Sequence, residues 1–434
     1  MSKMYKAVKH VEDEWIIQLD YKFIPIALRY QKVGFKIDRT RLEEEKVISL
    51  GVIDEMTNLL PEKPGEPGTD LLVNSWVQVR KLFDSDASDD TYLASVENDF
   101  ERFPDNTELE TRAVWAKAIR AKRSAIKRLA FIKSYEHDRV HQFVSPRTKS
   151  GRIAGESINL LQIPRSLKGA FGYRPEDNRF IVYADFSNLE LRMLACLINE
   201  EVMVDKFMND EDLHTYSGSN IYEKPINEVS KAERFIGKFF NFSAGYGAGA
   251  ARLCGMLLKE AGIFMEEDDM RPLLKKWKST FPAIKRMHLV NGRSKDNIAK
   301  TLGGRVVKCD LYTDLNAIPP QGSSAEVFKL TMLYLEKNLP GVKLMDAIHD
   351  SYLIEVEDLE EGKRVGTILA KCMITAWFQT IQNSQVPNLK MPTTALVGKN
   401  WGDIESDIFD AEVNLEGTYE EYETFKADTI NGNL

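Results

Sequence analysis

Two aspartates stand where apolar, strand-like runs of the sequence end. Asp185 follows the β-rich run 179–184 and precedes a helical pattern, and Asp350 lies between the apolar runs 344–348 and 352–356. A carboxylate between buried strands is costly unless something pairs with it. Two carboxylates at neighbouring strand ends can hold Mg²⁺, which prefers oxygen ligands and leaves places for waters and phosphates. Each Asp alone is more often a helix cap, so the pair is a candidate metal site.

A ladder of cations and aromatics offers a second kind of chemistry. Arg234, Lys238, Phe242 and Tyr246 are spaced by four residues each time, so they share one helical face that ends near Gly247. Arg and Lys one turn apart can clamp a triphosphate, and aromatic rings one turn further on can stack against a base or a sugar. An amphipathic helix with a basic edge is the plainer interpretation, and the ladder alone supports both equally.

The elements that position these residues follow from hydrophobic periodicity and turn residues. The patterns predict helices over 14–60, broken near Gly34, and a pair of long basic helices over 107–140. The basic pair is a solvated surface or a face that tracks phosphates. Further helices are expected within 231–253, ending at a Gly cluster, and over 265–290 and 321–338, with a hairpin at 301–307 and strands around the two aspartates.

The composition argues against a membrane protein and against a secreted protein, but it does not identify the binding partner. The chain has 434 residues, too many for one simple core, so two or more subdomains are expected. No apolar run approaches the ~20 residues of a membrane helix, the start lacks a signal-peptide core, and the four cysteines are far apart. These features predict a cytoplasmic protein without a membrane partner.

The net charge of −8 is unevenly distributed. Residues 402–434 contain ten acidic residues and one Lys, so this segment carries −9 and residues 1–401 carry +1. The body can therefore hold basic stripes, and the global charge does not exclude a nucleic-acid partner.

Three segments of the chain resemble the conserved motifs of the family A DNA polymerases. "DFSNLELR" (185–192) resembles motif A, "RFIGKFFNFSAGYG" (234–247) resembles motif B, and "HDS" (349–351) resembles motif C, which is usually H-D-E. Four further stretches follow the family's order: "GFKID" (34–38), "SGRIAGESINLLQIP" (150–164), "QGSSAEVFK" (321–329) and "GKNW" (398–401). Several motifs in one order identify the family far better than any single motif, and the resemblance extends from about residue 15 to residue 401.

The resemblance implies an α+β fold shaped like a right hand, with an antiparallel palm sheet, helical fingers and a helical thumb. The expected parts are an N-terminal lead and thumb (1–145), the first part of the palm (146–204), the fingers (205–300), the second part of the palm (301–401) and an acidic C-terminal tail (402–434). The tail is expected either to be disordered or to dock on the body.

The resemblance also implies template-directed DNA synthesis, in which a primer 3′-hydroxyl attacks a deoxynucleotide and pyrophosphate leaves. Asp185, Asp350 and the carbonyl of Phe186 would hold two Mg²⁺ ions. Arg234 and Lys238 would hold the triphosphate, and Lys238 is a candidate general acid toward pyrophosphate.

Four further residues would complete the nucleotide site by the same resemblance. His214 would contact the phosphates, and Phe242 would pack on the sugar. Glu190 would act as a steric gate, because its bulk stands where a ribose 2′-hydroxyl would go. Tyr246 would stand beside the nascent base pair.

The remaining expected contacts are with primer–template DNA. Gly247 would lie next to the template, and Arg152, Asn159, Gln321 and His349 would touch the duplex near the primer end. Minor-groove acceptors vary little between correct base pairs, so such contacts check geometry without reading sequence.

The sequence departs from the family pattern in places that bear on function. Ser351 replaces the usual Glu of motif C, so a direct third carboxylate ligand is not expected. The stretch "LNAIPPQG" (315–322) carries two prolines and an apparent extra residue, which leaves the role of Asn316 open. Because the chain begins almost at the thumb, no 3′–5′ exonuclease is expected on it.

Two alternatives compete with the DNA polymerase interpretation. A single-subunit RNA polymerase of the phage and mitochondrial type shares the ladder and often carries H-D-S, but Glu190 and "NLLQIP" (159–164) oppose it. An inactive DNA-binding accessory protein derived from a polymerase has Ser351 as its only support.

The expected partners are primer–template DNA and deoxynucleoside triphosphates. A separate exonuclease, helicase-primase or processivity factor is a candidate further partner of a monomeric enzyme. The expected setting is the cytoplasm of a bacterium or of a phage-infected host.

Overall fold

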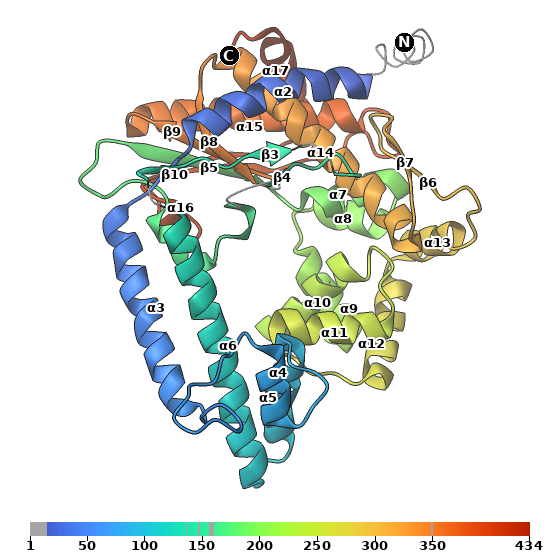
Figure 1. The fold of residues 1–434 in the computed structure, drawn as a ribbon. Helices are drawn as coiled ribbons and strands as arrows, with labels where there is room; N and C mark the ends of the chain where they lie inside the picture. The colour runs from blue at the N-terminus through green and yellow to red at the C-terminus, as the bar shows by residue number, and fades with distance from the viewer. Residues whose placement is uncertain (1–14, 136, 146–147, 156–159, 349) are drawn as a thin grey trace, which may run out of the picture. The chain divides into compact units, whose positions relative to one another are not determined.

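The computed structural model describes residues 15–135, 137–145, 148–155, 160–348 and 350–434, and the chain divides into two compact units (Figure 1). The first unit contains the described parts of residues 1–38, 137–247 and 276–434. The second contains residues 39–136, again where described, and 248–275. The two units are considered separately below, and the boundaries expected for palm, fingers and thumb remain predictions.

A five-stranded antiparallel sheet forms the centre of the first unit. Its strand order is β11-β10-β5-β9-β8. The strands comprise β5 (Phe180–Phe186), β8 (Lys343–Ile348), β9 (Ser351–Val356), β10 (Thr393–Gly398) and β11 (Ala411–Leu415). Every residue of β9 is buried, as a strand in the interior of a covered sheet requires. The apolar runs around Asp185 and Asp350 therefore form neighbouring strands, as the sequence predicted.

Long helices pack on one face of this sheet and against one another. Helix α15 (Leu359–Ile381) packs on β5, β10 and β11, and α14 (Tyr312–Asn338) packs on α15 and on α2 (Trp15–Val33) (Figure 1). Helix α14 begins nine residues before the helix expected at 321 and contains Pro319 and Pro320. Proline removes a backbone donor from a helix interior. The carbonyl that Pro319 leaves without a helical donor is that of Leu315, and it accepts from Asn291 Nδ2 of the helix before α14 at 3.4 Å.

Shorter helices of the first unit carry motif A and motif B. They are α7 (Leu189–Ile198), α8 (Glu201–Met208), α9 (Leu213–Tyr222), α10 (Lys231–Ser243) and α13 (Pro282–Asn291). Helix α10 begins with a capping box, in which Ser230 and Glu233 bond each other's backbone N–H. Helices α9 and α10 pack closely because both carry glycine at the crossing: a Cβ on Gly237 would lie 2.2 Å from the carbonyl oxygen of His214.

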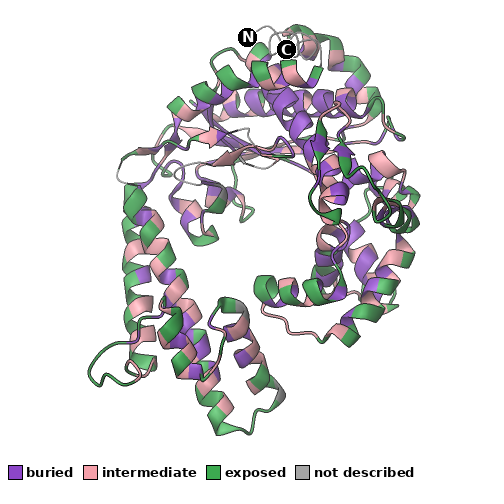
Figure 2. Cartoon of the chain, turned by 45° about the vertical axis from the view of Figure 1, so that its right-hand side comes forward, coloured by how far each residue is buried: buried purple, intermediate pink, exposed green. Residues whose placement is uncertain are grey.

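The second unit consists of helices around its own small core. Its members are α3 (Arg39–Leu59), α4 (Trp76–Phe83), α5 (Asp90–Arg102), α6 (Thr107–Ser134) and α11 (Ala250–Ala261), while α12 (Glu267–Thr280) spans the division. The long helices carry buried residues on some faces and exposed residues on others (Figure 2). The core includes Val79, Phe83 and Ile119.

One prediction for this unit was wrong. A helix pair was expected over 107–140, but residues 107–134 form the single helix α6, because no Gly or Pro interrupts them and Asn106 caps the start. Several of its cations bond within the unit: Arg120 pairs with Glu97 at 2.6 Å and Arg123 with Asp90 at 2.9 Å.

The acidic C-terminal segment is folded against the first unit. It contributes α16 (Trp401–Ile404), the edge strand β11 and α17 (Tyr419–Asn431). Tyr422 stacks on Phe378 of α15 with ring centroids 4.9 Å apart, and Asn338 Nδ2 donates to the carbonyl of Thr429 at 2.8 Å. Of the two expectations for this segment, docking was therefore the correct one.

The remaining elements are short. They are the strand pairs β1 (Phe35–Lys36) with β2 (Arg139–Val140), β3 (Val144–Ser145) with β4 (Ala154–Gly155) and β6 (Ile298–Lys300) with β7 (Val306–Lys308), and the 3₁₀ turns η1 (Leu160–Gln162), η2 (Arg165–Ala170) and η3 (Ile226–Glu228). The β6–β7 pair is the hairpin expected at 301–307. Among the described helices, none is long and apolar enough to span a bilayer.

A fully buried carboxyl in β8 gives the first testable prediction. Asp346 is 1% exposed; its Oδ1 accepts from the N–H of Ala347, and its Oδ2 has no partner among the described residues. Burial raises the pKa of Asp346 to about 7. Because this folded-state pKa lies above the unfolded value, the contribution to stability is complete below about pH 4 and disappears as the pH rises through 7. Asp346→Asn should therefore flatten the decline in unfolding free energy from pH 5 to pH 8 by about 2 kcal/mol.

Urea titrations of the two proteins at these pH values measure the difference. Parallel pH profiles for the wild type and the variant would contradict a protonated Asp346.

Candidate active site

Asp185 and Asp350 lie next to each other at one end of the neighbouring strands β5 and β9. Asp185 lies near the end of β5, and Asp350 lies in the turn between β8 and β9. In the β5–β9 register Asp185 is opposite Ser351, and the N–H of Phe186 donates to the carbonyl of Asp350 at 3.3 Å. The sheet register thus brings together two residues that are 165 positions apart in the chain.

Burial makes both carboxyl groups of this pair harder to ionise. The surrounding protein and then the charge of Asp350 raise the pKa of Asp185 to about 8, and the two carboxyls share a hydrogen bond. Burial also raises the pKa of Asp350, while Arg152 opposes the shift. The side chain of Asp185 nevertheless keeps exposed surface, so a cation can reach it. A pair of this kind favours a bound cation that neutralises both charges.

Ser351 occupies the position where the family usually has Glu. Its side chain is buried opposite Asp185, and its hydroxyl hydrogen-bonds the hydroxyl of Tyr183 on the same strand as Asp185. Among the described residues no group of three or more His, Cys, Asp and Glu side chains could hold a metal. The described site therefore presents the two carboxylates of Asp185 and Asp350, and the prediction that Ser351 supplies no metal ligand stays a prediction.

Four predicted site residues form a second cluster. Arg152 forms an ion pair with Glu190, and the hydroxyl of Tyr246 donates to the other oxygen of the same carboxylate. The side chain of Gln321 hydrogen-bonds Tyr246. Glu190 is thus held from two sides, and Arg152 lies close enough to Asp350 to stabilise its negative charge.

The predicted ladder lies along α10 only as far as Phe242. Tyr246 lies in the turn that follows, because the helix ends at Ser243 and Gly247 has a positive φ, so the prediction of one shared helical face was wrong for Tyr246. Arg234 and Lys238 are exposed near the start and middle of α10, whereas Phe242 is half-buried near its end. Arg234 Nε contacts Asp212 Oδ2 at 2.6 Å, and this contact lowers the pKa of Asp212 to about 2 although burial opposes the shift. Asp212 was not among the predicted site residues, and its only sequence clue was its position as a cap before α9.

His214 lies against the ladder from the neighbouring helix α9. Its ring centroid is 5.8 Å from that of Phe242. Burial, with smaller contributions from Arg234 and Lys238, lowers the pKa of His214 to about 4, against the opposing effect of Asp212. The imidazole is therefore neutral at physiological pH.

A set of hydrogen bonds holds the turn that follows α10. Asn316 of α14 donates to the carbonyl of Tyr246 at 3.4 Å and accepts from Asn291 of α13 at 2.8 Å. His288 of α13 bonds the carbonyl of Gly245 at 2.9 Å. The sequence left the role of Asn316 open, and the structure places it in this support. Two predicted DNA contacts, Asn159 and His349, lie outside the described residues.

The same turn gives the second testable prediction. Gly247 has φ +93°, and a Cβ there would lie 2.8 Å from Asn316 Nδ2 and 3.0 Å from the ring of Tyr312. Gly247→Ala should therefore shift the turn and lower kcat/KM for the expected nucleotide addition about tenfold, equivalent to about 1.4 kcal/mol. Gly255→Ala in α11 is the matched control, because its added Cβ meets nothing within 4 Å. Equal kcat/KM values for the two variants would contradict this role of the turn.

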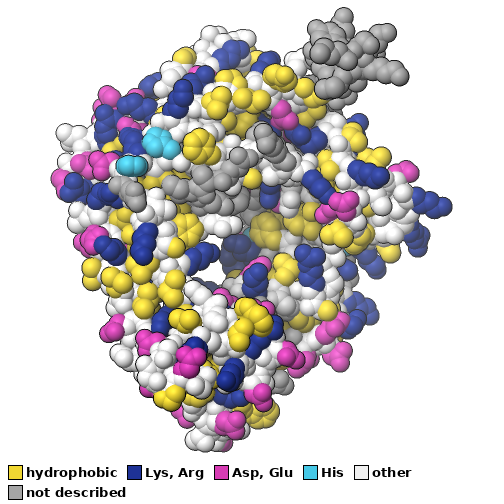
Figure 3. All heavy atoms as spheres, viewed as in Figure 1, with side chains coloured by type: hydrophobic (Ala, Val, Ile, Leu, Met, Phe, Trp, Pro, Cys, Tyr) yellow, Lys and Arg dark blue, Asp and Glu magenta, His cyan; other side chains and the backbone are white. Residues whose placement is uncertain are grey.

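Charged side chains of both signs are mixed on the molecular surface, and Figure 3 shows basic and acidic groups interspersed on one face.

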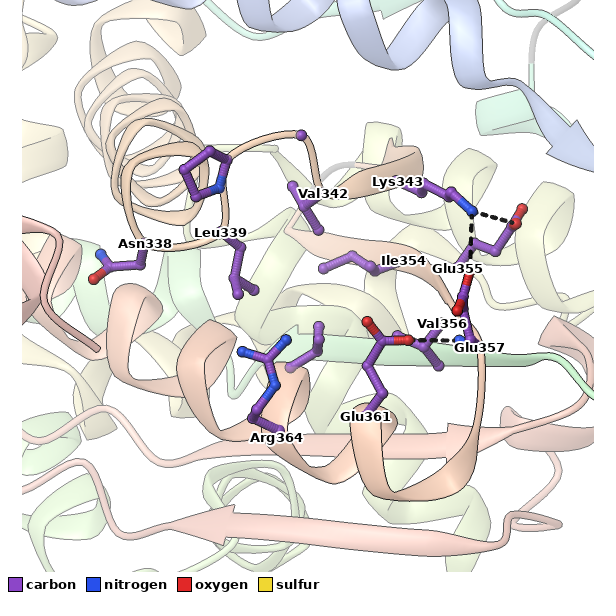
Figure 4. A pocket seen from close by; sticks show the side chains of 13 residues that line it. Asn338, Leu339, Val342, Lys343, Ile354, Glu355, Val356, Glu357, Glu361 and Arg364 are labelled. Atoms are coloured by element: carbon purple, nitrogen blue, oxygen red, sulfur yellow. Dashed lines mark hydrogen bonds and ion pairs between the residues drawn. The ribbon is translucent and has the colours of Figure 1, made fainter.

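A separate cavity of about 280 Å³ lies at the connection between α14 and β8 (Figure 4). Its edge includes Lys343, Glu355 and Glu357, and Arg364 of α15 lies on the opposite side. The cavity adjoins the start of β8, whereas Asp350 follows the end of that strand. This cavity is therefore distinct from the candidate site.

Comparison with a solved structure defines the class of fold. The structure of the "POL domain of Pol1 from M. smegmatis complex with DNA primer-template and dNTP" superposes with a TM-score of 0.72 at 18% identity, covering 88% of this chain and 70% of that one. The chain therefore has the α+β fold of a DNA polymerase I polymerase domain, with an antiparallel palm sheet and helical fingers and thumb.

Sequence comparison then identifies the family. Residues 105–403 match the family described as "DNA polymerase family A", so this chain belongs to DNA polymerase family A. It is 30% identical to DNA polymerase I of Aquifex aeolicus over 238 residues, which cover 52% of this chain and 40% of the relative. It is 25% identical to DNA polymerase I of Borreliella burgdorferi over 429 residues, which cover 90% and 44%. The chain thus spans less than half the length of these two relatives.

Proposed function

We propose that this protein is a template-directed DNA polymerase that adds deoxynucleotides to a primer 3′-hydroxyl. The observation that carries the proposal is the contact between the carboxyls of Asp185 and Asp350 in a chain that belongs to family A. The relatives named DNA polymerase I and the neighbouring polymerase domain, whose complex holds primer–template and dNTP, support the same activity.

The residues at the paired carboxyls suit magnesium. All the candidate donors are oxygens, the pair repels itself without a counter-ion, and one member is open to solvent. Asp185, Asp350 and the carbonyl of Phe186 would hold two Mg²⁺ ions. When bound, the ions would supply activation of the primer hydroxyl and neutralisation of charge on the leaving oxygen.

The ladder on α10 binds and orients the triphosphate in this proposal. Arg234 exchanges Asp212 for phosphate oxygens, and Lys238 supplies a second positive charge one turn away. Lys238 Nζ donates a proton to the departing pyrophosphate. Phe242 packs on the sugar, and His214 contributes a neutral hydrogen-bond donor toward the phosphates.

The cluster around Glu190 selects the sugar and positions the template pair. Glu190 blocks the 2′ position of the nucleotide, while Tyr246 and Gly247 border the nascent base pair. Arg152 and Gln321 contact the duplex near the primer end, together with Asn159 and His349. This arrangement would favour deoxynucleotides, because the ion pair with Arg152 and the hydrogen bond from Tyr246 restrict the movement of the gate carboxylate.

A primer-extension assay with Mg²⁺, all four dNTPs and the matched NTPs tests the proposal. Template-dependent extension with a clear preference for dATP over ATP is the expected result. Preference for ATP would instead indicate an RNA polymerase, and no extension with either substrate would indicate an accessory protein.

A further inference from the structure

A buried asparagine beside His214 has every polar atom of its side chain bonded. Asn241 of α10 is 1% exposed. Its Oδ1 accepts hydrogen bonds from Ser217 Oγ and Trp277 Nε1, both at 2.8 Å. Its Nδ2 faces the carbonyl of Leu213 at 3.4 Å and the Nδ1 atom of His214 at 3.1 Å. The amide therefore links the interior of the fold to the histidine ring.

The direction of this amide follows from Trp277. An indole N–H can only donate, so the atom of Asn241 that faces it must be the acceptor oxygen. The serine hydroxyl could adapt to either orientation, but the buried indole cannot. The NH₂ group of Asn241 must then face His214.

The proton of His214 is placed by the same reasoning. An amide NH₂ donates and cannot accept, so His214 Nδ1 must be the unprotonated nitrogen. A neutral imidazole carries one proton, which is therefore on Nε2. Protonation of Nδ1 would set two donors against each other in a buried site, and the low pKa of His214 agrees with this arrangement.

We propose that Asn241, oriented by Trp277, is a positioning residue that keeps the proton of His214 on Nε2 and so makes the ring a fixed, neutral donor to the triphosphate. This inference rests on the proposed nucleotide site. Arg234 and Lys238 attract the anion by charge, whereas a neutral imidazole with a defined N–H selects one direction of approach. The charged groups around the ring are Asp212 from α9 and Arg234 and Lys238 from α10.

Nitrogen NMR of the full chain tests the tautomer directly. The wild type is ¹⁵N-labelled at histidine, and its His214 signals are assigned by their loss in His214→Gln. Between pH 6 and pH 8 the expected pattern has a protonated Nε2 and an unprotonated Nδ1. A protonated Nδ1 in this range would overturn the inference. Because this measurement needs no catalysis, it separates a failure of the inference from a failure of the proposed function.

Two variants connect the tautomer to nucleotide binding. Asn241→Leu keeps a similar volume but removes the amide, so the fixed tautomer should be lost and KM for dATP should rise about three- to tenfold, the worth of one hydrogen bond, with kcat changed less than about twofold. Ser217→Ala is the control, because it removes one bond to Asn241 Oδ1 and leaves the bonds to Trp277 and His214 in place. Its KM should stay within about twofold of the wild type.

Two results in this series would overturn the inference. One is an unchanged KM in His214→Gln, which would show that the ring makes no useful contact with the nucleotide. The other is an Asn241→Leu protein that keeps both the wild-type tautomer and the wild-type KM. If Asn241→Leu does not fold, the wild-type NMR pattern and the KM of His214→Gln still decide the matter.

Discussion

Asp350→Asn is expected to lower the rate of primer extension at least about a thousandfold, equivalent to about 4 kcal/mol in the activation barrier. The variant keeps the size of the side chain but removes half of the charge that would hold the metal ions. Asp185 would then face the incoming phosphates with an amide beside it in place of a carboxylate. Because Ser351 supplies no charge, the described site has no third carboxylate to compensate. Single-turnover extension of a labelled primer measures the effect.

The neighbouring strand offers a matched control. Asp346→Asn removes a carboxyl from β8, but Asp346 is fully buried and its charge acts on the buried Tyr30 of α2, so normal extension is expected. Thermal unfolding adds a readout that needs no catalysis: Mg²⁺ should stabilise the wild type and not Asp350→Asn. Without Mg²⁺ at pH 8, Asp350→Asn should be at least as stable as the wild type, because the repulsion that raises the pKa of Asp185 is removed. A normal extension rate in Asp350→Asn would show that the metal assignment is wrong.

The strands and the ladder could be predicted because local sequence determines them. Alternating and continuous apolar runs located β5, β8 and β9, and their ends located the two aspartates. The spacing of four residues correctly placed Arg234, Lys238 and Phe242 on one face of a single helix. It was wrong for Tyr246, which lies in the turn after the helix ends at Ser243. In these cases the residues that define the strand or helix pattern either include the functional side chains or lie directly beside them in the chain.

The partners of these residues could not be predicted from local patterns. Asp212 meets Arg234 only because glycines let α9 and α10 pack closely. Ser351 bonds Tyr183 across two strands, a contact that depends on the register of the sheet. The early start of α14 was missed because Pro319 and Pro320 ordinarily end a helix, whereas burial among α2, α7 and α15 stabilises it here. Tertiary packing therefore determines these side-chain partners and the start of α14, and local sequence patterns do not record it.

Glu190→Ala is expected to reduce the preference for dATP over ATP about a hundredfold, equivalent to about 2.7 kcal/mol. In the proposed complex the carboxylate occupies the space beside the sugar 2′ position. The ion pair with Arg152 and the hydrogen bond from Tyr246 restrict its movement. A gate fixed in this way excludes a 2′-hydroxyl by its position, whereas a free side chain could rotate aside. The ratio of kcat/KM values for the two nucleotides on one primed template measures the preference.

The contacts of Glu190 also predict how a partial change should behave. Tyr246→Phe removes one hydrogen bond to the carboxylate but leaves its bulk and its pairing with Arg152, so the preference for dATP should fall only severalfold, by about 1 kcal/mol. The preference for dATP over ATP should therefore decrease in the order wild type, Tyr246→Phe, Glu190→Ala, because each change leaves the space beside the sugar 2′ position less well blocked. A preference that survives in Glu190→Ala would place sugar selection elsewhere in the site. An equal loss in both variants would mean that the orientation of the carboxylate, more than its bulk, excludes the ribonucleotide.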